Sequence, residues 1–158
     1  MAIASGNPAP KFTLKTLTPE GLVDVSLESN FGKTTTVLLF FPLAFTGVCT
    51  QELCEVTSSL NAYTRLNADV LAISVDSPFA QAAWAKQEKI TLRILSDLNK
   101  ETARAYGVLL PNLLGIGDAA ARAVFVVDKT GVIRHAEQTP TPHDLPNLAK
   151  VQEVLATL

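Results

Sequence analysis

The chain has 158 residues, a net charge of −2 and a hydrophobic content of 47%. Its length lies within the range of about 100–200 residues typical of one domain and excludes a two-domain enzyme, and its hydrophobic content excludes a disordered chain. Thirteen Lys and Arg residues are interspersed with fifteen Asp and Glu residues, so no basic patch is available for nucleic acid or an anionic membrane. We therefore expect one folded domain over residues 1–158 that binds neither.

The cysteine content and the N-terminus indicate the cellular compartment. Cys49 and Cys54 are too few for a disulfide scaffold, and their position beside the most apolar stretch favours a reducing environment. The first twelve residues contain one lysine and two prolines and lack the apolar core of a secretory signal. The longest apolar run, 37–45, is about half of the ~20 residues that a transmembrane helix needs. We expect a cytoplasmic protein.

The first half of the chain alternates strands and helices. Residues 12–14 and 22–26 alternate apolar and polar side chains around a turn, which predicts an N-terminal β-hairpin. Residues 34–41 are β-branched and then apolar, as in a strand buried on both faces, and Pro42 ends this strand because proline has no N–H donor. Apolar residues at steps of three and four then predict a helix over 48–66.

The second half continues this alternation. Ser77 and Pro78 predict an N-cap and a first helical position for an Ala-rich helix that ends near Lys89. Residues 111–117 contain a proline and two glycines and predict an irregular loop. The order of elements predicts an α/β, thioredoxin-like fold with a mixed central sheet flanked by helices. The other elements expected are strands at 69–74, 92–95, 123–127 and 132–135, and helices at 99–106 and 145–155, the last with Asp144 as its cap.

Cys49 lies where the buried strand gives way to a helix. A thiol in the first turn of a helix faces unpaired N–H groups and the positive end of the helix dipole, which favour thiolate over thiol. The same N–H groups, with the hydroxyl of Thr46, can hold an oxygen-rich substrate against the sulfur. Cys49 is therefore a candidate nucleophile, and such a pocket suits a peroxide.

Cys54 follows five residues later. On a regular helix it is rotated by about 140° from Cys49 and displaced by about 7.5 Å, so a disulfide between them requires the first turns to unwind. This fits a cycle in which Cys49 becomes a sulfenic acid and Cys54 condenses with it. The alternative is a structural Cys54, because free cysteine is among the most buried residue types. The C-x₄-C spacing differs from the C-x-x-C motif of thioredoxins.

Few other residues can bind metal or support a thiolate. His135 and His143 are far apart and have no ligand spacing, so we expect no metal site and place both histidines on the surface. Arg122 interrupts the apolar run 119–127, where an arginine needs either an anionic partner or access to solvent. Glu52 either accepts a hydrogen bond from an N–H group at the helix start or pairs with this arginine.

The segment Pro42-x-x-x-Thr46-x-x-Cys49 is similar to the P-x-x-x-T-x-x-C signature of the peroxiredoxins. The resemblance covers essentially the whole chain: 6–12 resembles the opening of that family, 72–77 a strand with the start of its helix, and Arg122 with 125–131 the strand that bears the active-site arginine. It implies a thioredoxin fold and a peroxidatic role for Cys49. It also implies that Thr46 and Arg122 contact the transition state and that Pro42 shields the sulfur.

Two segments of the chain resemble two different branches of the family. Residues 41–47 are most similar to the AhpE-type one-cysteine branch, whereas the Cys49–Cys54 spacing matches the bacterioferritin-comigratory (PrxQ) branch. The resemblance implies a peroxidase for hydrogen peroxide, organic hydroperoxides or peroxynitrite, which needs no cofactor. It further implies that Cys54 resolves the sulfenic acid as an intramolecular disulfide, which thioredoxin or a glutaredoxin-like protein reduces. The AhpE-like features favour a homodimer and the PrxQ-like spacing a monomer.

Three alternatives remain at this point. The first is a one-cysteine peroxidase in which Cys54 is structural. The second is a non-catalytic thioredoxin-fold interaction protein in which both cysteines are inert. The third is a disulfide oxidoreductase or metallochaperone that acts on proteins instead of peroxides.

Overall fold

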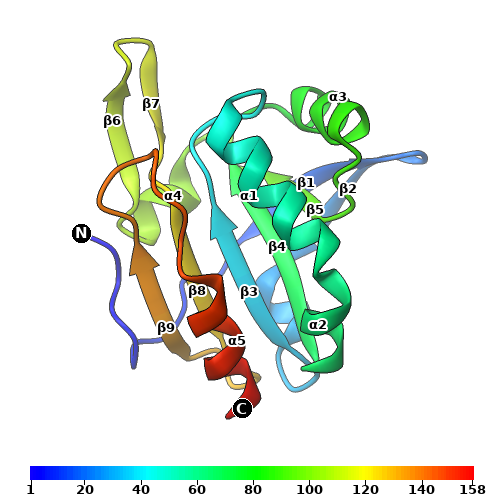
Figure 1. Cartoon of the computed structure of the whole chain (residues 1–158), viewed down its shortest axis with the longest axis vertical. Coiled ribbons are helices and arrows are strands. Elements are labelled where there is room, and N and C mark those ends of the chain that lie inside the picture. The colour runs from blue at the N-terminus through cyan, green and yellow to red at the C-terminus, as the bar shows by residue number, and fades with distance from the viewer.

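The computed structural model describes all 158 residues and is built around a seven-stranded sheet (Figure 1). Its strand order is β2-β1-β5-β4-β3-β8-β9. Strand β3 pairs in parallel with β4 and antiparallel with β8, so the sheet is mixed, as predicted. The strands are β1 (Thr13–Thr18), β2 (Gly21–Ser26), β3 (Thr35–Phe40), β4 (Ala68–Ser74), β5 (Arg93–Ser96), β8 (Ala123–Val127) and β9 (Ile133–Gln138).

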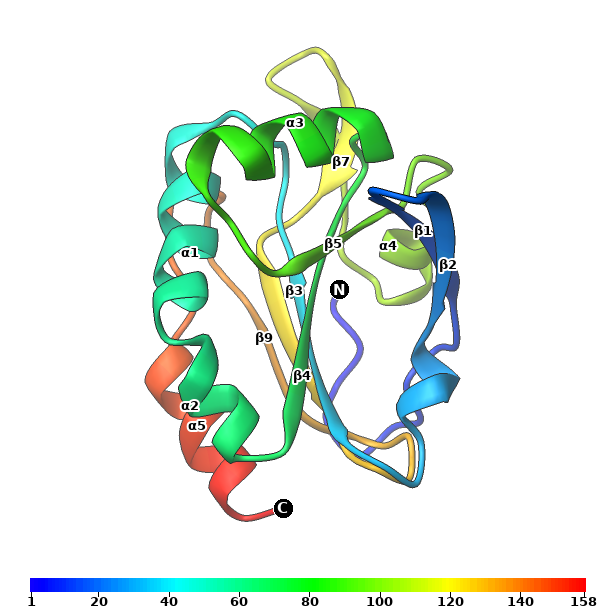
Figure 2. The ribbon, with the colours of Figure 1, turned by 90° about the vertical axis from the view of Figure 1, so that its right-hand side faces the viewer.

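Helices cover both faces of this sheet (Figure 2). Helices α1, α2 and α5 lie on one side, and α4 lies on the other beside the β1–β2 hairpin. No helix is both long enough and apolar enough to cross a membrane. The helices are α1 (Gly47–Ser58), α2 (Leu60–Arg65), α3 (Pro78–Glu88), α4 (Glu101–Ala105) and α5 (Leu148–Ala156), with a 3₁₀ turn at Leu27–Asn30.

Strand β3 separates two hydrophobic cores. All six of its residues are buried, and its side chains alternate between the two faces. Val37 and Leu39 belong to the core that contains residues of α1, α3 and α5, whereas Leu38 and Phe40 belong to the core on the other face. Because β3 is packed on both sides, its C-terminal end has a fixed position, and the segment that leads to Cys49 starts there.

Most predicted elements are present, but the predicted helix over 48–66 is two helices. Helix α1 ends at Ser58 and α2 begins at Leu60. Ser59 departs from helical geometry with φ −108° and ψ 14°, and its N–H donates to the carbonyl oxygens of both Glu55 and Val56. Neither proline nor glycine marks this break, so the apolar periodicity alone did not show it.

Two further predictions were wrong. Residues 111–117 are not an irregular loop, because most of them belong to a hairpin of β6 (Leu109–Leu113) and β7 (Gly117–Ala120). The proline and glycines that suggested a loop lie in and around the tip of that hairpin. Asp144 does not cap α5, since the side chain of Asn147 accepts the N–H of Lys150. Asp144 instead accepts a hydrogen bond from the N–H of Thr141. The predicted cap of α3 is confirmed, because Ser77 accepts the N–H of Ala80.

Candidate active site

The loop after β3 sets the position of Cys49. The N–H of Phe41 still donates to Ile73 of β4 at 3.0 Å, and Pro42 then turns the chain out of the sheet. Asp76 fixes this loop, since its Oδ2 accepts the N–H of Ala44 at 2.9 Å. The chain then enters α1 at Gly47, so Cys49 lies in the first helical turn, as the sequence predicted.

Cys49 is in direct contact with Arg122. The Nη2 of Arg122 donates to the Sγ of Cys49 at 3.0 Å, although the two residues are 73 positions apart in the sequence. Cys49 is 1% exposed and Arg122 is 2% exposed. The Nε of Arg122 also donates to the carbonyl oxygen of Pro142 at 3.0 Å, which fixes the plane of the guanidinium. A buried cation hydrogen-bonded to sulfur stabilises the thiolate form of Cys49.

Glu52 is the second partner of Arg122. Its Oε2 forms a buried ion pair with the Nη1 of Arg122, so the second of the two roles considered from the sequence is the one observed. Burial raises the pKa of Glu52 to about 7, and the nearby Arg122 only partly opposes this effect. Burial also lowers the pKa of Arg122, but the charges and hydrogen bonds of Cys49 and Glu52 outweigh it, so the net shift is upward. The guanidinium therefore stays charged.

A cavity of about 170 Å³ leads to Cys49. Pro42, Thr46 and Arg122 line it together with Cys49, so the structure brings four of the five predicted site residues together. The hydroxyl of Thr46 donates to the carbonyl oxygen of Leu43 at 2.7 Å, which leaves its lone pairs free to accept a hydrogen bond. The N–H groups of the first turn of α1 have no partner within the helix. The cavity thus combines donors for a negative oxygen with an acceptor for a proton.

Cys54, the fifth predicted residue, does not line this cavity. Its half-buried Sγ donates to the carbonyl oxygen of Glu88 at the end of α3, at 3.8 Å. Burial raises the pKa of Cys54, and the charge of Glu88 adds to this effect. Both cysteines are free thiols. The prediction that they occupy different faces of the helix is confirmed.

Sequence reasoning missed several residues of the site. Leu113 and Leu114, from the β6–β7 hairpin, and His143 all line the cavity. His143 is exposed, as predicted, but it lies at the cavity because Arg122 holds the carbonyl oxygen of the preceding residue. No local sequence signal predicts such a contact. The prediction that His135 lies on the surface was wrong, since its side chain, on the edge strand β9, is only 17% exposed.

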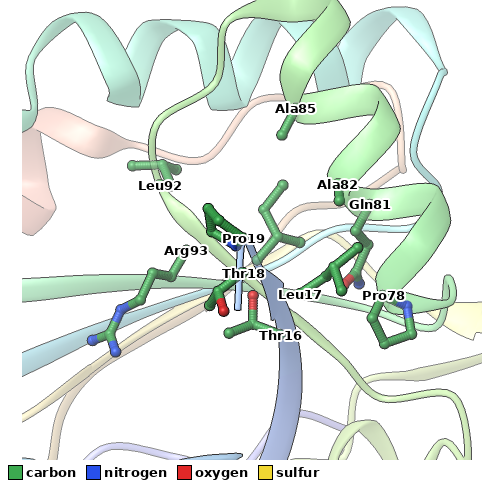
Figure 3. A pocket seen from close by; sticks show the side chains of 11 residues that line it. Thr16, Leu17, Thr18, Pro19, Pro78, Gln81, Ala82, Ala85, Leu92 and Arg93 are labelled. Atoms are coloured by element: carbon green, nitrogen blue, oxygen red, sulfur yellow. The ribbon is translucent and has the colours of Figure 1, made fainter. Parts of the chain in front are cut away.

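A second hollow of about 210 Å³ lies between α3, β5 and the turn of the β1–β2 hairpin (Figure 3). No cysteine lines it. The one charged side chain at its edge, Arg93, is directed away from the other lining residues and pairs with Asp69 at 2.6 Å. The combination of a nucleophile and a buried cation is found only in the cavity at Cys49.

Comparison with known proteins agrees with the geometry of this site. Residues 5–136 match the AhpC/TSA family. The chain is 33% identical to the chloroplastic 2-Cys peroxiredoxin of Hordeum vulgare, over 97% of this chain and 72% of that protein. It is 38% identical to the mitochondrial thioredoxin-dependent peroxide reductase of Homo sapiens, over 84% of this chain and 51% of that protein.

The fold agrees with these sequence matches. The mitochondrial 2-Cys peroxiredoxin of Plasmodium falciparum superposes with a TM-score of 0.84 at 29% identity, over 97% of this chain and 92% of that one. The predicted thioredoxin-like fold is therefore confirmed, whereas the similarity to the AhpE and PrxQ branches remains a prediction. On the family match, the sequence identities and the fold, this chain belongs to the AhpC/TSA family of peroxiredoxins.

Proposed function

We propose that this protein is a thiol-dependent peroxidase in which peroxide oxidises Cys49 and Cys54 resolves the product. The observation that carries the proposal is the 3.0 Å hydrogen bond from Arg122 Nη2 to Cys49 Sγ at the cavity. This contact stabilises the attacking thiolate and places a fixed positive charge where a leaving oxygen can be held.

In the first step, the Cys49 thiolate attacks the terminal oxygen of the hydroperoxide. The O–O bond breaks, the sulfur becomes a sulfenic acid, and the remaining oxygen leaves and takes a proton to give an alcohol or water. The sulfur loses two electrons and the peroxide gains them, so no metal or organic cofactor is required. Arg122 and the N–H groups of the first turn stabilise the charge on the leaving oxygen, while Thr46 accepts a hydrogen bond from the peroxide. Pro42 covers one side of the cavity.

In the second step, Cys54 attacks the sulfur of the Cys49 sulfenic acid and releases water, which leaves an intramolecular disulfide. The first turns of α1 must unwind, because the two side chains lie on different sides of the helix. A dithiol protein then reduces the disulfide. The name of the human relative, thioredoxin-dependent peroxide reductase, supports thioredoxin as this reductant, and a glutaredoxin-like protein is the alternative.

Two further proposals concern the cellular compartment and the oligomeric state of the enzyme. A chain with only two cysteines, too few for a disulfide scaffold, suits a reducing compartment such as the cytoplasm. The AhpE-like segment 41–47 supports a homodimer that forms through loops near the active site.

Trp84 makes the proposed function easy to test, because its Nε1 donates to the hydroxyl of Thr50, next to Cys49. One equivalent of hydrogen peroxide should change the Trp84 fluorescence and remove both free thiols of the wild-type protein. Cys49→Ser should abolish peroxide consumption. A wild-type protein that keeps both thiols and its fluorescence would be an inert thioredoxin-fold domain, and this outcome would contradict the proposal.

A second candidate, a one-cysteine peroxidase, is favoured by the surroundings of Cys54. Its thiol donates a hydrogen bond to the carbonyl oxygen of Glu88, which holds it away from Cys49. Burial raises the pKa of this thiol, so Cys54 is a weak nucleophile in this position. In that case an external thiol attacks the sulfenic acid directly, and Cys54→Ser leaves turnover with that thiol unchanged.

A further inference from the structure

Among the residues that line the cavity at Cys49, three carry ionisable side chains: Cys49, Arg122 and His143. Cys49 is the proposed nucleophile. Arg122 stays charged, because the charges and hydrogen bonds of its neighbours raise its pKa, so it can hold a negative oxygen but cannot give up a proton. His143 is therefore the lining residue that can exchange a proton near neutral pH.

The turn that contains His143 is tied to Arg122. The Nε of Arg122 donates to the carbonyl oxygen of Pro142 at 3.0 Å, and this carbonyl belongs to the peptide bond that leads into His143. The N–H of His143 donates to the hydroxyl of Thr141 at 3.2 Å. The hydroxyl of Thr141 in turn donates to Oδ2 of Asp144 at 2.9 Å. These contacts keep His143 at the cavity, beside the guanidinium.

The imidazole of His143 is exposed and takes part in none of the ion pairs of the chain. The neighbouring carboxylates are engaged elsewhere. Asp144 accepts from Thr141, Glu137 of β9 accepts the N–H of Asn147 at 3.1 Å, and Glu52 pairs with Arg122 across the cavity. An imidazole with free nitrogens and access to water can give a proton to a substrate and take another from solvent.

The proposed reaction needs a proton beside Arg122. When the Cys49 thiolate takes the terminal oxygen, the O–O bond breaks and the other oxygen leaves as an alkoxide, or as hydroxide from hydrogen peroxide. Such a strongly basic oxygen leaves faster when it is protonated as it departs. Arg122 stabilises its negative charge but cannot supply this proton.

We infer that His143, in its imidazolium form, donates the proton to the leaving oxygen and is a further catalytic residue of the enzyme. The inference rests on the proposed peroxidase function. A lone pair of the thiolate forms the sulfur–oxygen bond, and the electron pair of the O–O bond stays with the leaving oxygen. That oxygen takes the proton from the imidazolium, which leaves an alcohol or water and a neutral imidazole. Solvent then returns a proton to His143, so no further reagent is needed.

The first test compares two peroxides whose leaving groups differ in basicity. The second-order rate constant for Cys49 oxidation is measured by Trp84 fluorescence with hydrogen peroxide and with peracetic acid. Hydroxide needs a proton as it leaves, whereas acetate is stable as an anion. His143→Gln should slow the reaction with hydrogen peroxide about ten- to a hundredfold and leave that with peracetic acid within about twofold of wild type. His135→Gln is the matched control and should keep both rates, because His135 does not line the cavity.

The second test is the pH profile with hydrogen peroxide. The ratio of the wild-type rate to that of His143→Gln should fall between about pH 6 and about pH 8, because only the wild type loses an acid there. Burial raises the pKa of Glu52 to about 7, so this carboxyl titrates in the same range. The ratio is therefore also measured between Glu52→Gln and the double variant Glu52→Gln/His143→Gln, where it should fall in the same way.

Equal losses with the two peroxides in His143→Gln, or a ratio that does not change with pH, would overturn the inference and leave His143 a packing role. A ratio that falls only when Glu52 is present would assign the titrating group to Glu52 and would also overturn it. A wild-type protein whose Cys49 reacts with neither peroxide would instead refute the proposed function. The failure of one proposal is thus distinguished from the failure of the other.

Discussion

Cys49 and Cys54 lie on the same helix, but their sulfur atoms have different neighbours. The Sγ of Cys49 accepts a hydrogen bond from the buried cation Arg122, whereas the Sγ of Cys54 donates to the carbonyl oxygen of Glu88. The first environment stabilises an anion, and the second holds a neutral thiol whose pKa is raised by burial. In the proposed cycle, this difference lets one helix present an active nucleophile to peroxide and keep the second thiol unreactive until α1 unwinds.

The side of α1 that bears Cys54 is held by α3 and the residues that follow it. Trp84 Nε1 donates to the hydroxyl of Thr50 at 3.1 Å near the start of α1. Near its end, the N–H of Thr91 donates to the hydroxyl of Thr57 at 3.3 Å. In the proposed cycle, unwinding of the first turns of α1 releases the first of these contacts and leaves the second in place.

The largest expected effect concerns the neighbour of Cys49. Lysine keeps the charge of Arg122 but cannot contact Cys49, Glu52 and Pro142 at once, because it lacks the planar fork of the guanidinium. Arg122→Lys should therefore slow oxidation of Cys49 about a hundredfold, measured by stopped-flow fluorescence of Trp84. Arg134→Lys, at a half-exposed ion pair, is the control. A rate within about twofold of wild type would show that the guanidinium fork of Arg122 is not required and that a positive charge at this position is sufficient.

The next largest effect concerns Cys54, the second cysteine of α1. Cys54→Ser should leave the oxidation of Cys49 nearly unchanged, since Cys54 does not contact the cavity. Turnover with thioredoxin should fall about tenfold or more, because no intramolecular disulfide can form. This turnover is measured as the steady-state rate of peroxide consumption, with thioredoxin and with a glutaredoxin-like protein as the reductant. Unchanged thioredoxin-dependent turnover would remove the resolving role and leave Cys54 as a structural residue.

The buried Glu52 makes stability depend on pH. Its pKa is about 7 in the folded protein, above its ordinary value of 4.5, so the unfolded chain releases this proton first as pH rises. The stabilising contribution is complete below pH 4.5 and is lost as pH rises through about 7. The free energy of unfolding of wild type, relative to Glu52→Gln, should fall by up to about 3 kcal/mol across this window. Urea titrations at several pH values measure it, and parallel profiles for the two proteins would contradict the assignment.

The smallest effect concerns the contact between α1 and Trp84. Thr50→Val preserves side-chain shape and removes the hydroxyl that accepts from Trp84 Nε1 and donates to the carbonyl oxygen of Thr46 at 2.8 Å, so α1 should unwind more readily. One such bond contributes about 0.5–1.5 kcal/mol, so disulfide formation should accelerate about three- to tenfold in quenched-flow measurements. Thr57→Val is the matched control, because Thr57 lies beyond the turns that must unwind. Equal rates in the two variants would show that the Trp84 contact does not restrain α1.

The sequence predicted the parts of the site that depend on local rules. The buried strand, the stop at Pro42 and the position of Cys49 follow from apolar patterning and helix geometry, and the five-residue spacing predicted that Cys54 faces elsewhere. The pairing of Glu52 with Arg122 was one of two alternatives that the sequence left open.

The remaining features depend on contacts between distant segments. Arg122 donates to the carbonyl oxygen of Pro142, and this contact helps to place His143 at the cavity. Leu114 reaches the cavity through a hairpin whose proline and two glycines indicated a loop. The cap at Asn147 was missed because Asp144, three residues earlier, is an equally good capping residue in isolation.

The intact mass of the protein after one equivalent of hydrogen peroxide tests the division of roles between Cys49 and Cys54 most directly. We expect each chain to lose about 2 Da, the two hydrogens released when Cys49 and Cys54 form an internal disulfide, with no covalent dimer. A stable gain of about 16 or 32 Da would show that Cys49 stops at sulfenic or sulfinic acid, and it would contradict the proposal that Cys54 resolves the reaction.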